Sequence, residues 1–439
     1  MEVNFFWFRR DLRIADNHGL YHALSSNLPV IPVFIFDENI LDSLKKDDAR
    51  VEFLHQALED LAKEIEKTGS SLLVLKGDPI KIWEDLTKKY IIRTVFFNHD
   101  LEPYPRDRDQ KVAKILSAKG SEMKGYKDHL IYEAGEIVKD DGKPYTVFTP
   151  YKNKWLFHLQ LLMSEQIPAA LQSWPSQNYI DNFCKTPKPF QLPTLEQIGF
   201  VSSGLAFPPK SVASSVISQY DKNRDYPAIP GTSKLGVHFR FGTISIRDKA
   251  LKALKLNATY LNELIWRDFY AMILFHFPET TTRSFRPEYD NIEWRNDEKE
   301  FERWKQGKTG YPLVDAGMRE IKATGYMHNR VRMVVASFLT KHLLIDWRWG
   351  EAYFAEMLLD YEQASNVGGW QWAAGCGTDA APYFRIFNPT AQAEKFDPDE
   401  LYIRKWVPEW KTASYPQPIV DHKLARERCL ITYKRALSK

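Results

Sequence analysis

The sequence predicts an α/β domain followed by an all-α domain, with a doubly wound parallel sheet (Rossmann-like) in the first third of the chain. Three observations support this prediction. Short, almost continuous apolar segments alternate with segments of helical periodicity near the start. Such apolar segments disappear beyond residue 211. Stretches with apolar residues three and four positions apart then continue toward the end of the chain.

Four segments of the first third have the composition of strands that are buried on both faces: residues 3–8, 30–36, 72–75 and 94–98. Helical periodicity predicts three helices among and after them, over residues 51–67, 79–90 and 105–119. Neither G-x-G-x-x-G nor G-x-x-x-x-G-K follows the first of these strands. A nucleotide bound to this domain would therefore need a different phosphate-binding loop.

Prolines interrupt the pattern between about residues 140 and 209, which we interpret as a long surface connector with a few short helices. Further helices are expected over residues 261–277, 311–324, 329–344 and 350–359. We therefore predict an α/β domain over residues 1–132, a connector over 133–209 and a helical domain over 210–430.

The composition excludes several classes of protein. The chain has 439 residues, and its 60 Lys+Arg nearly balance its 57 Asp+Glu, which excludes a histone-like nucleic-acid binder. A hydrophobic content of 44% excludes wholesale disorder, and no apolar segment is long enough for a membrane span. Three cysteines that lie far apart argue against a disulfide framework or a zinc site, so we expect no metal and a reducing compartment, the cytoplasm.

Tryptophan and positive charge are concentrated in the same half of the chain. Nine of the 13 Trp lie between Trp266 and Trp410. Residues 201–439 carry 34 Lys/Arg and 28 Asp/Glu, a balance of +6, whereas the whole chain carries only +3. A polyanionic or phosphate-containing partner would meet this half first.

The segment Gly231-Thr232-Ser233-Lys234-Leu235-Gly236 precedes a predicted helix. Its hydroxyls, backbone N–H groups and lysine suit a phosphate or pyrophosphate. A helix N-cap by Thr232 or Ser233 is the alternative interpretation.

Glu263, Trp266 and Arg267 lie within one helical turn. They form either a surface Glu–Arg pair beside a core tryptophan or a carboxyl, an indole and a cation that converge on one ligand. The indole could then stack on a base and the arginine could bind a phosphate.

Two further segments allow a structural or a functional interpretation. Arg330 and Arg332 fall at a predicted helix start, either as a solvated basic turn or as a phosphate clamp. The segment from Asp360 to Trp372 combines acids, two glycines and two tryptophans, and could be a loop with a packed tail or the lining of a pocket.

Trp294, Trp347 and Trp370 are either core residues or, if contiguous, a path for an electron.

Several long motifs resemble the photolyase/cryptochrome family, and they occur in its order along almost the whole chain. They are Trp7-Phe8-Arg9-Arg10-Asp11-Leu12-Arg13, the segment 231–236, residues 262–270, KTGYPLVD at 308–315, residues 326–333, residues 368–372 and TDAAPYFRIFNP at 378–389. The resemblance is closest to the class I branch that repairs cyclobutane pyrimidine dimers. It implies an N-terminal antenna domain and a C-terminal helical domain that binds FAD.

By this resemblance, the residues that hold FAD are Tyr220, Thr232, Ser233, Lys234, Leu235, Gly236, Tyr260, Asp360, Tyr361, Glu362 and Asn366. Asn366 aligns with the residue that faces flavin N5. Relatives commonly have Asp at the position of Glu362, so a contact there has to be made with a longer side chain. Trp370, Trp347 and Trp294 align with the electron-transfer triad, in this order from the flavin to the surface.

The resemblance also implies that the partner is UV-damaged DNA with its dimer flipped out of the helix. The residues that align with contacts to the lesion or to its flanking backbone are Arg224, Glu263, Trp266, Arg267, Tyr270, Asn329, Arg330, Met333, Trp372, Arg385 and Gln392. Glu263 would lie in a poorly hydrated cleft, where we expect its pKa to be raised. It could then donate a hydrogen bond to the pyrimidine carbonyl.

The predicted function is therefore light-driven repair of cyclobutane dimers, a carbon–carbon lyase activity. Met333 and Trp372 favour it over (6-4) photolyases, which tend to have His at the first position, and over the DASH branch, which tends to have Tyr at the second. A cryptochrome-like blue-light receptor is the main alternative, and Asn366, the Glu263/Trp266 pair and the lack of a long tail argue against it. A catalytically inactive DNA-binding relative is the third alternative.

A second, antenna chromophore is predicted less specifically. Tyr104 and Pro105 stand where the folate-binding type has an Asn-Glu pair, so a deazaflavin is favoured over a folate. An empty pocket or one filled by a flavin is equally allowed. We expect a monomer that has no contact with membranes and that associates with the nucleoid if the organism is a bacterium.

Overall fold

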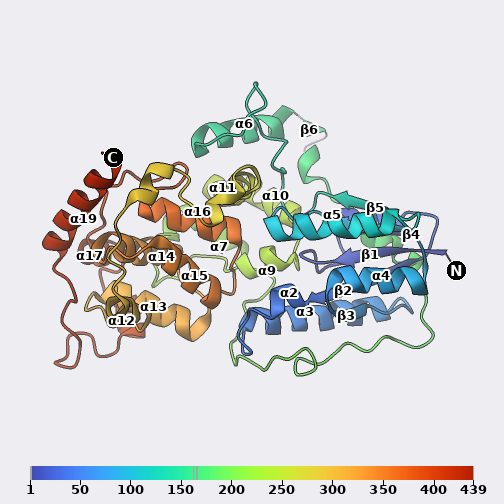
Figure 1. Ribbon diagram of the computed structural model, residues 1–439, viewed down its shortest axis with the longest axis horizontal. Coiled ribbons are helices and arrows are strands. Elements are labelled where there is room, and N and C mark those ends of the chain that lie inside the picture. Colours follow the sequence, from blue (N-terminus) through green and yellow to red (C-terminus); the bar gives the residue numbers. More distant parts are fainter. Residues whose placement is uncertain (1, 162, 165–166, 439) are drawn as a thin grey trace. The chain divides into compact units, whose positions relative to one another are not determined.

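A computed structural model describes residues 2–161, 163–164 and 167–438 (Figure 1). The chain divides into two compact units, both discontinuous in sequence. The first unit comprises Met1–Ile137, Asn153–Ser211 and Leu235–Lys255, and the second comprises Val138–Lys152, Val212–Lys234 and Leu256–Lys439.

A parallel five-stranded sheet forms the centre of the first unit. Its order is β3-β2-β1-β4-β5, with the strands β1 (Glu2–Phe8), β2 (Val30–Asp37), β3 (Leu73–Gly77), β4 (Ile91–Asn98) and β5 (Glu122–Tyr126). The four predicted strands are confirmed. The fifth was missed because β5 lies at an edge and its residues, EMKGY, are half-buried or exposed rather than a continuous apolar run.

Helices cover both faces of this sheet, as its almost continuously apolar strands require. Phe6 and Phe8 of β1 pack on one face with α1 (His18–Leu24) and α3 (Ala49–Glu66). Phe5 and Trp7 pack on the other with α4 (Pro79–Lys89) and α5 (Pro103–Ser117). The predicted helices over 51–67, 79–90 and 105–119 and the doubly wound sheet are therefore confirmed. The remaining elements of this unit are α2 (Glu38–Leu41), β6 (Met163–Ser164), β7 (Ile167–Pro168), η1 (Ala169–Leu171), η2 (Ser176–Asn182), α9 (Gly236–Phe241) and α10 (Ile246–Leu256).

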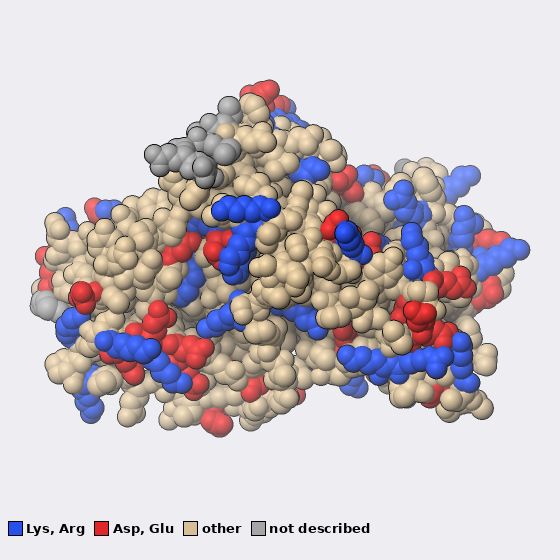
Figure 2. All heavy atoms as spheres, turned by 180° about the vertical axis from the view of Figure 1, so that it is seen from behind, with Lys and Arg blue, Asp and Glu red and all other residues tan. Residues whose placement is uncertain are grey.

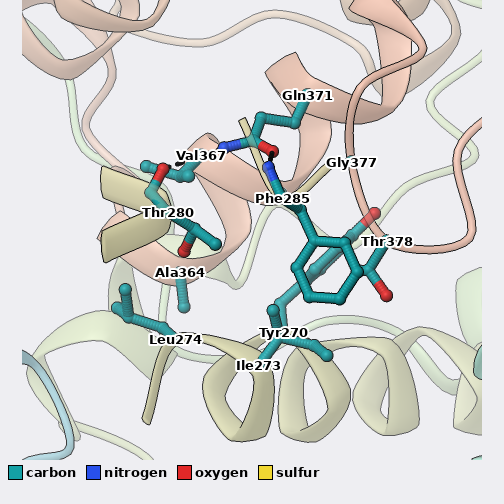
Figure 3. A pocket seen from close by; sticks show the side chains of 11 residues that line it. Tyr270, Ile273, Leu274, Thr280, Phe285, Ala364, Val367, Gln371, Gly377 and Thr378 are labelled. Carbon is teal, nitrogen blue, oxygen red and sulfur yellow. Dashed lines mark hydrogen bonds between the residues drawn. The ribbon is translucent and has the colours of Figure 1, made fainter. Parts of the chain in front are cut away.

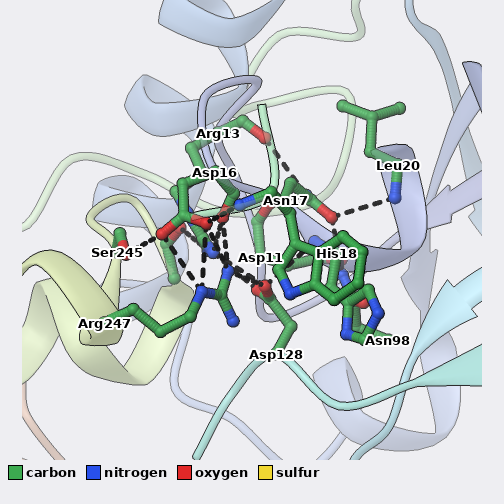
Figure 4. A network of polar contacts seen from close by, with 12 residues as sticks. Asp11, Arg13, Asp16, Asn17, His18, Leu20, Asn98, Asp128, Ser245 and Arg247 are labelled. Carbon is green, nitrogen blue, oxygen red and sulfur yellow. Dashed lines mark hydrogen bonds and ion pairs between the residues drawn. The ribbon is translucent and has the colours of Figure 1, made fainter. Parts of the chain in front are cut away.

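Buried ion pairs join α10 to the loops that follow β1 and β5 in the first unit (Figure 4). The Arg247 guanidinium donates to Asp128 at 2.7 Å and to Asp16 at 3.0 Å, and Arg13 also donates to Asp128 at 2.7 Å. Burial raises the pKa of Asp128, but the two arginines outweigh burial and hold it at about 2. These contacts hold residues 235–255, which fall within the helical domain predicted over 210–430, in the first unit.

The second unit is helical. Its elements are α7 (Ser214–Ser218), α8 (Tyr220–Asn223), α11 (Ala258–His276), η3 (Pro278–Thr281), η4 (Pro287–Asn291), α12 (Glu298–Lys305), α13 (Pro312–Thr324), α14 (Asn329–Ser337), η5 (Phe338–His342), α15 (Trp347–Met357), α16 (Gln363–Ala374), α17 (Pro389–Phe396), α18 (Leu401–Trp406) and α19 (His422–Leu437). The helix α6 (Phe148–Leu161) begins in this unit and continues in the first. The helical character predicted for this half is confirmed. The helix predicted over 329–344 is interrupted, because its second half, η5, is a π-helix.

One apolar core holds the second unit together, and it accounts for much of the tryptophan content. Trp304, Trp347 and Trp370 are fully buried in it. Trp294, Trp349, Trp372, Trp406 and Trp410 pack against it and stay partly buried. Among the helices of the described residues, none combines the length and apolar character that a membrane crossing needs.

Candidate functional site

Helix α11 carries the first group of predicted site residues. Asn257 caps the helix, because its side chain accepts hydrogen bonds from the backbone N–H groups of Thr259 and Tyr260. Glu263 and Trp266, three positions apart, lie on neighbouring positions of one helix surface. Both side chains are only partly buried.

Glu263 pairs with Arg224 and not with the neighbouring Arg267. The Arg224 guanidinium donates to the Glu263 carboxylate at 2.6 Å, and 31% of the Glu263 side chain is exposed. Burial raises the pKa of Glu263, and the nearby Arg224 only partly offsets this. The raised pKa of Glu263 agrees with our expectation. The alternative interpretation, a surface pair between Glu263 and Arg267, is wrong.

Arg267 instead forms a two-pronged pair with Glu362 at the start of α16. Its guanidinium donates to the two carboxylate oxygens at 3.0 and 2.9 Å, and the side chains are only 10% and 12% exposed. Glu362 is the N-cap residue of α16, yet its side chain does not cap the helix. The longer side chain at this position therefore connects α16 to α11.

The hydroxyls of Thr232 and Ser233 bind tyrosines of the second unit. Thr232 Oγ1 lies 3.1 Å from the Tyr326 hydroxyl, and the Tyr260 hydroxyl donates to Ser233 Oγ at 3.0 Å. Neither residue caps α9, whose N-cap is Leu235 without a side-chain hydrogen bond. The N-cap interpretation is therefore wrong, and Gly236 is the first residue of the helix.

Cationic groups lie beside these hydroxyls. Lys234 Nζ is 4.6 Å from the centre of the Tyr326 ring, and Arg332 is 5.7 Å from it. Arg332 also donates to the Asp360 carboxylate at 2.9 and 3.1 Å and to the carbonyl of Met327 at 2.7 Å. The Arg332 side chain is thus bound by other residues, so the interpretation as a solvated basic turn does not apply to it. The sequence names Arg332 only as part of a possible phosphate clamp and does not single out Tyr326, although both lie in the motif over residues 326–333.

This donor set fits FAD. Two hydroxyls, a lysine and a partly buried arginine suit the negative charge of a diphosphate. The Nε2 atom of the buried His328 has no protein partner, and burial lowers the pKa of this imidazole to about 4. Tyr220 adds an aromatic wall, because its ring meets that of Tyr260 edge-on at 5.1 Å. Tyr361, between the two paired acids, packs against the core of the unit.

Helix α16 places Asn366, Trp370 and Trp372 on a regular scaffold, so a loop over this segment is wrong. Asn366 donates through its amide to the Glu351 side chain at 2.8 Å and to the Glu351 carbonyl at 3.0 Å. Burial raises the pKa of Glu351. Asn366 is thereby oriented by a neighbour that sequence analysis did not identify.

The glycine pair in α16 is explained by close packing. A Cβ atom on Gly368 would lie 2.3 Å from the Tyr270 ring of α11, whereas one on Gly369 would meet nothing within 4 Å. Gly368 therefore lets α11 and α16 approach closely. Tyr270 also lines a small, largely apolar pocket with residues of α16 and the following loop (Figure 3). Of our predicted site residues, this pocket contains Tyr270 alone.

The three aligned tryptophans differ in their surroundings. Trp370 and Trp347 are buried, and Trp294 is partly buried against the same core. Gly350, one turn after Trp347, faces Trp370 so closely that a Cβ atom would lie 2.1 Å from its ring. The ring of Trp294 meets Tyr433 edge-on at 6.0 Å.

The remaining residues predicted to bind DNA lie on α14, on α17 and on the loop before it. Asn329 and Arg385 are exposed. Arg330 donates to Asp225 at 2.7 Å and lies over the Phe396 ring at 4.3 Å, and its Nη1 is 3.8 Å from the sulfur of Met333. Gln392 keeps a buried oxygen without a partner. Figure 2 shows basic and acidic side chains interspersed on one face of the molecule, in keeping with the nearly balanced charge.

In the first unit, a hydrogen bond and an ion pair connect α5, which carries Tyr104, to Asp37 at the end of β2. The Tyr104 hydroxyl donates to Asp37 at 2.8 Å, and Arg108 donates to the same carboxylate at 3.3 Å. The guanidinium groups of Arg9 and Arg108 both lie near the Trp7 ring, at 5.1 and 4.8 Å from its centre.

Comparison with known proteins identifies the family. Residues 4–172 match the family model "DNA photolyase", and residues 260–414 match "FAD binding domain of DNA photolyase", so the predicted FAD cofactor is confirmed. Proteins named deoxyribodipyrimidine photo-lyase are similar over nearly their whole length: 37% identity in Halobacterium salinarum (99% of both chains), 36% in Synechococcus sp. (98% of this chain, 96% of the relative) and 34% in Escherichia coli (99% of both).

Solved structures of similar proteins share the fold. A bacterial class III photolyase from Agrobacterium tumefaciens has a TM-score of 0.85 at 34% identity, covering 100% of this chain and 98% of that one. An archaeal photolyase from Sulfolobus tokodaii with two FAD molecules has a TM-score of 0.84 at 35% identity, covering 99% and 100%. A cryptochrome from Synechocystis sp. has a TM-score of 0.80 at 26% identity, covering 98% and 99%. This chain belongs to the DNA photolyase family.

Proposed function

We propose that the protein repairs cyclobutane pyrimidine dimers in DNA in a light-driven reaction. One observation carries the proposal. A carboxyl group with a raised pKa, Glu263, and a half-buried indole, Trp266, lie on neighbouring positions of α11, which packs against the helix that carries Asn366, Trp370 and Trp372.

The lesion has to leave the duplex to reach such a site. A dimer stacks poorly on its neighbours, so flipping it out costs less than flipping a normal pair, which itself favours damaged sites. Trp266 and Trp372 offer indole surfaces to the flipped bases. Arg385 and Asn329 are exposed, and Arg385 can bind a backbone phosphate beside the lesion.

Glu263 provides a hydrogen-bonding group for the flipped dimer. A carboxyl group with a raised pKa keeps its proton at higher pH than usual, so it can donate to a carbonyl oxygen of the dimer. It also stabilises negative charge on that carbonyl. The Arg224 guanidinium, 2.6 Å away, limits how far the pKa rises and orients the carboxyl group.

The residues that would hold FAD are Tyr220, Tyr260, Asn366 and the group of hydroxyls and cations around Tyr326. When bound, FAD supplies light absorption and the donation of a single electron. Asn366 is neutral and is held by Glu351, so it adds no charge at its position. Arg332 and Asp360 orient each other and keep their charges paired in a poorly hydrated region.

The test is a repair assay on oligonucleotides that contain one defined lesion. The reduced, FAD-loaded protein should restore cyclobutane dimers under blue light and leave them intact in the dark. Turnover of (6-4) lesions instead would reassign the substrate, and light absorption without repair of either lesion would favour a photoreceptor. Binding to the damaged strand should weaken as salt rises, because contacts with phosphates release counterions.

We further propose that the protein acts as a monomer in the cytoplasm, which sedimentation and cell fractionation would test. A second chromophore of the deazaflavin type remains our proposal for the first unit, based on Tyr104 and Pro105. Extraction of the purified protein and spectroscopy of the released pigments would identify it. A folate, or FAD alone, would contradict it.

A further inference from the structure

A phenylalanine outside the predicted site stacks directly on Trp266. The rings of Phe148 and Trp266 lie 3.6 Å apart between centres and are parallel to within 6°. Phe148 is 7% exposed, whereas Trp266 is only partly buried. One face of the indole is therefore covered by Phe148, and part of the Trp266 side chain remains exposed.

The segment that carries Phe148 is fixed to the loop that also carries Arg385. The backbone N–H of Phe148, at the start of α6, donates to the Asp379 carboxylate at 3.2 Å. The Thr378 hydroxyl donates to the carbonyl of Thr146. Two hydrogen bonds between this backbone and adjacent loop residues thus anchor the segment that carries the phenyl ring.

A third aromatic ring packs against both Phe148 and Trp266. Phe269 of α11 meets Phe148 edge-on at 5.7 Å and Trp266 at 5.6 Å. A partly exposed indole can usually adopt several side-chain rotamers, and ordering it on binding costs free energy. The stack with Phe148 lowers this cost, because it restricts the indole to one orientation before DNA binds. Any other rotamer of the indole would lose the contacts with the phenyl ring.

We propose that Phe148 is a positioning residue for lesion recognition: it holds Trp266 in the orientation that receives a flipped pyrimidine dimer. The inference rests on the proposed function and adds to it a residue from a distant part of the sequence. Phe148 itself touches no substrate, so its effect should appear in dimer binding and not in repair once the dimer is bound.

The experiment measures binding in the dark to an oligonucleotide with one cyclobutane dimer and to the same oligonucleotide undamaged. Phe148→Leu keeps apolar volume and removes the stack, and should weaken dimer binding about fivefold. Binding to undamaged DNA and FAD content should stay as in the wild type. Phe148→Tyr should restore dimer binding. Phe157→Leu is the matched control, because Phe157 lies on the same helix and is 51% exposed.

A kinetic measurement separates positioning from general damage to the fold. For Phe148→Leu, KM for the dimer should rise while kcat under saturating light is unchanged. Asp379→Ala loosens the same segment without altering the ring and should raise KM in the same direction. Unchanged dimer binding in both variants, or equal losses for damaged and undamaged DNA, would overturn the inference. If the wild type itself fails to repair dimers, the proposed function is wrong. If the wild type repairs dimers and Phe148→Leu binds them as tightly as the wild type does, only the inference about Phe148 is wrong.

Discussion

The Arg224–Glu263 pair predicts how repair depends on pH. If the protonated Glu263 donates to the dimer, repair per absorbed photon should fall as pH rises through its pKa. Arg224 opposes the effect of burial on that pKa, so Arg224→Met removes a stabilising charge from the carboxylate form. The descending limb of the profile should then move to higher pH.

The size of this movement follows from the contact. A hydrogen bond between charged groups contributes roughly 1.5–3 kcal/mol, and the lower end applies here because a quarter of the Arg224 side chain (25%) is exposed. About 1.4 kcal/mol corresponds to a movement of about 1 pH unit. Glu263→Gln keeps a neutral donor without a titrating group, so its profile should be flat over this range.

The assay is the initial rate of dimer repair at saturating DNA and constant light, measured from acidic to alkaline pH with reduced, FAD-loaded protein. Direct binding measurements at each pH separate repair from DNA affinity, which Arg224→Met also changes if this arginine contacts the backbone. A limb that moves to lower pH in Arg224→Met would refute this reasoning. So would a Glu263→Gln variant that retains the wild-type limb.

Three further predictions concern residues of the second unit. Gly368→Ala should destabilise the protein by about 1–3 kcal/mol, because its Cβ would lie 2.3 Å from an aromatic ring of α11, whereas Gly369→Ala should be neutral or slightly stabilising in thermal unfolding. Trp294→Phe should slow photoreduction of oxidised FAD and leave repair by the reduced enzyme unchanged. Trp410→Phe, on the same core, should change neither rate. Equal photoreduction in the two variants would show that the electron reaches FAD by another route. Burial lowers the pKa of Lys341 to about 8, so the unfolded state binds its proton more tightly and stability should rise above pH 8, a rise that Lys341→Met should abolish.

The sequence alone determined the secondary structure wherever an element is buried on both faces or carries a clear helical periodicity. Four strands and the main helices of the first unit followed from local apolar patterns. The edge strand Glu122–Tyr126 did not, because only part of it is buried and its composition is mixed. The segment Gln363–Ala374 was also ambiguous, because paired glycines disfavour a helix until packing against α11 requires one of them.

The residues of the candidate site could likewise be predicted only in part from the sequence. Motif order along the chain was enough to nominate Glu263, Trp266 and the hydroxyls before α9, because a family resemblance is carried by sequence. It was not enough to find their partners. Local spacing suggested that Glu263 pairs with Arg267, whereas Arg224, 39 residues earlier, takes that place.

Only the tertiary structure decided which charges meet and which ring lies behind Trp266. Arg267 meets Glu362 95 residues away, and the ring behind Trp266 comes from another segment altogether, at Phe148. Spacing along a helix reports neighbours within one turn. Ion pairs and stacked rings between helices depend on how the whole core packs, and that packing is set by all the buried residues together.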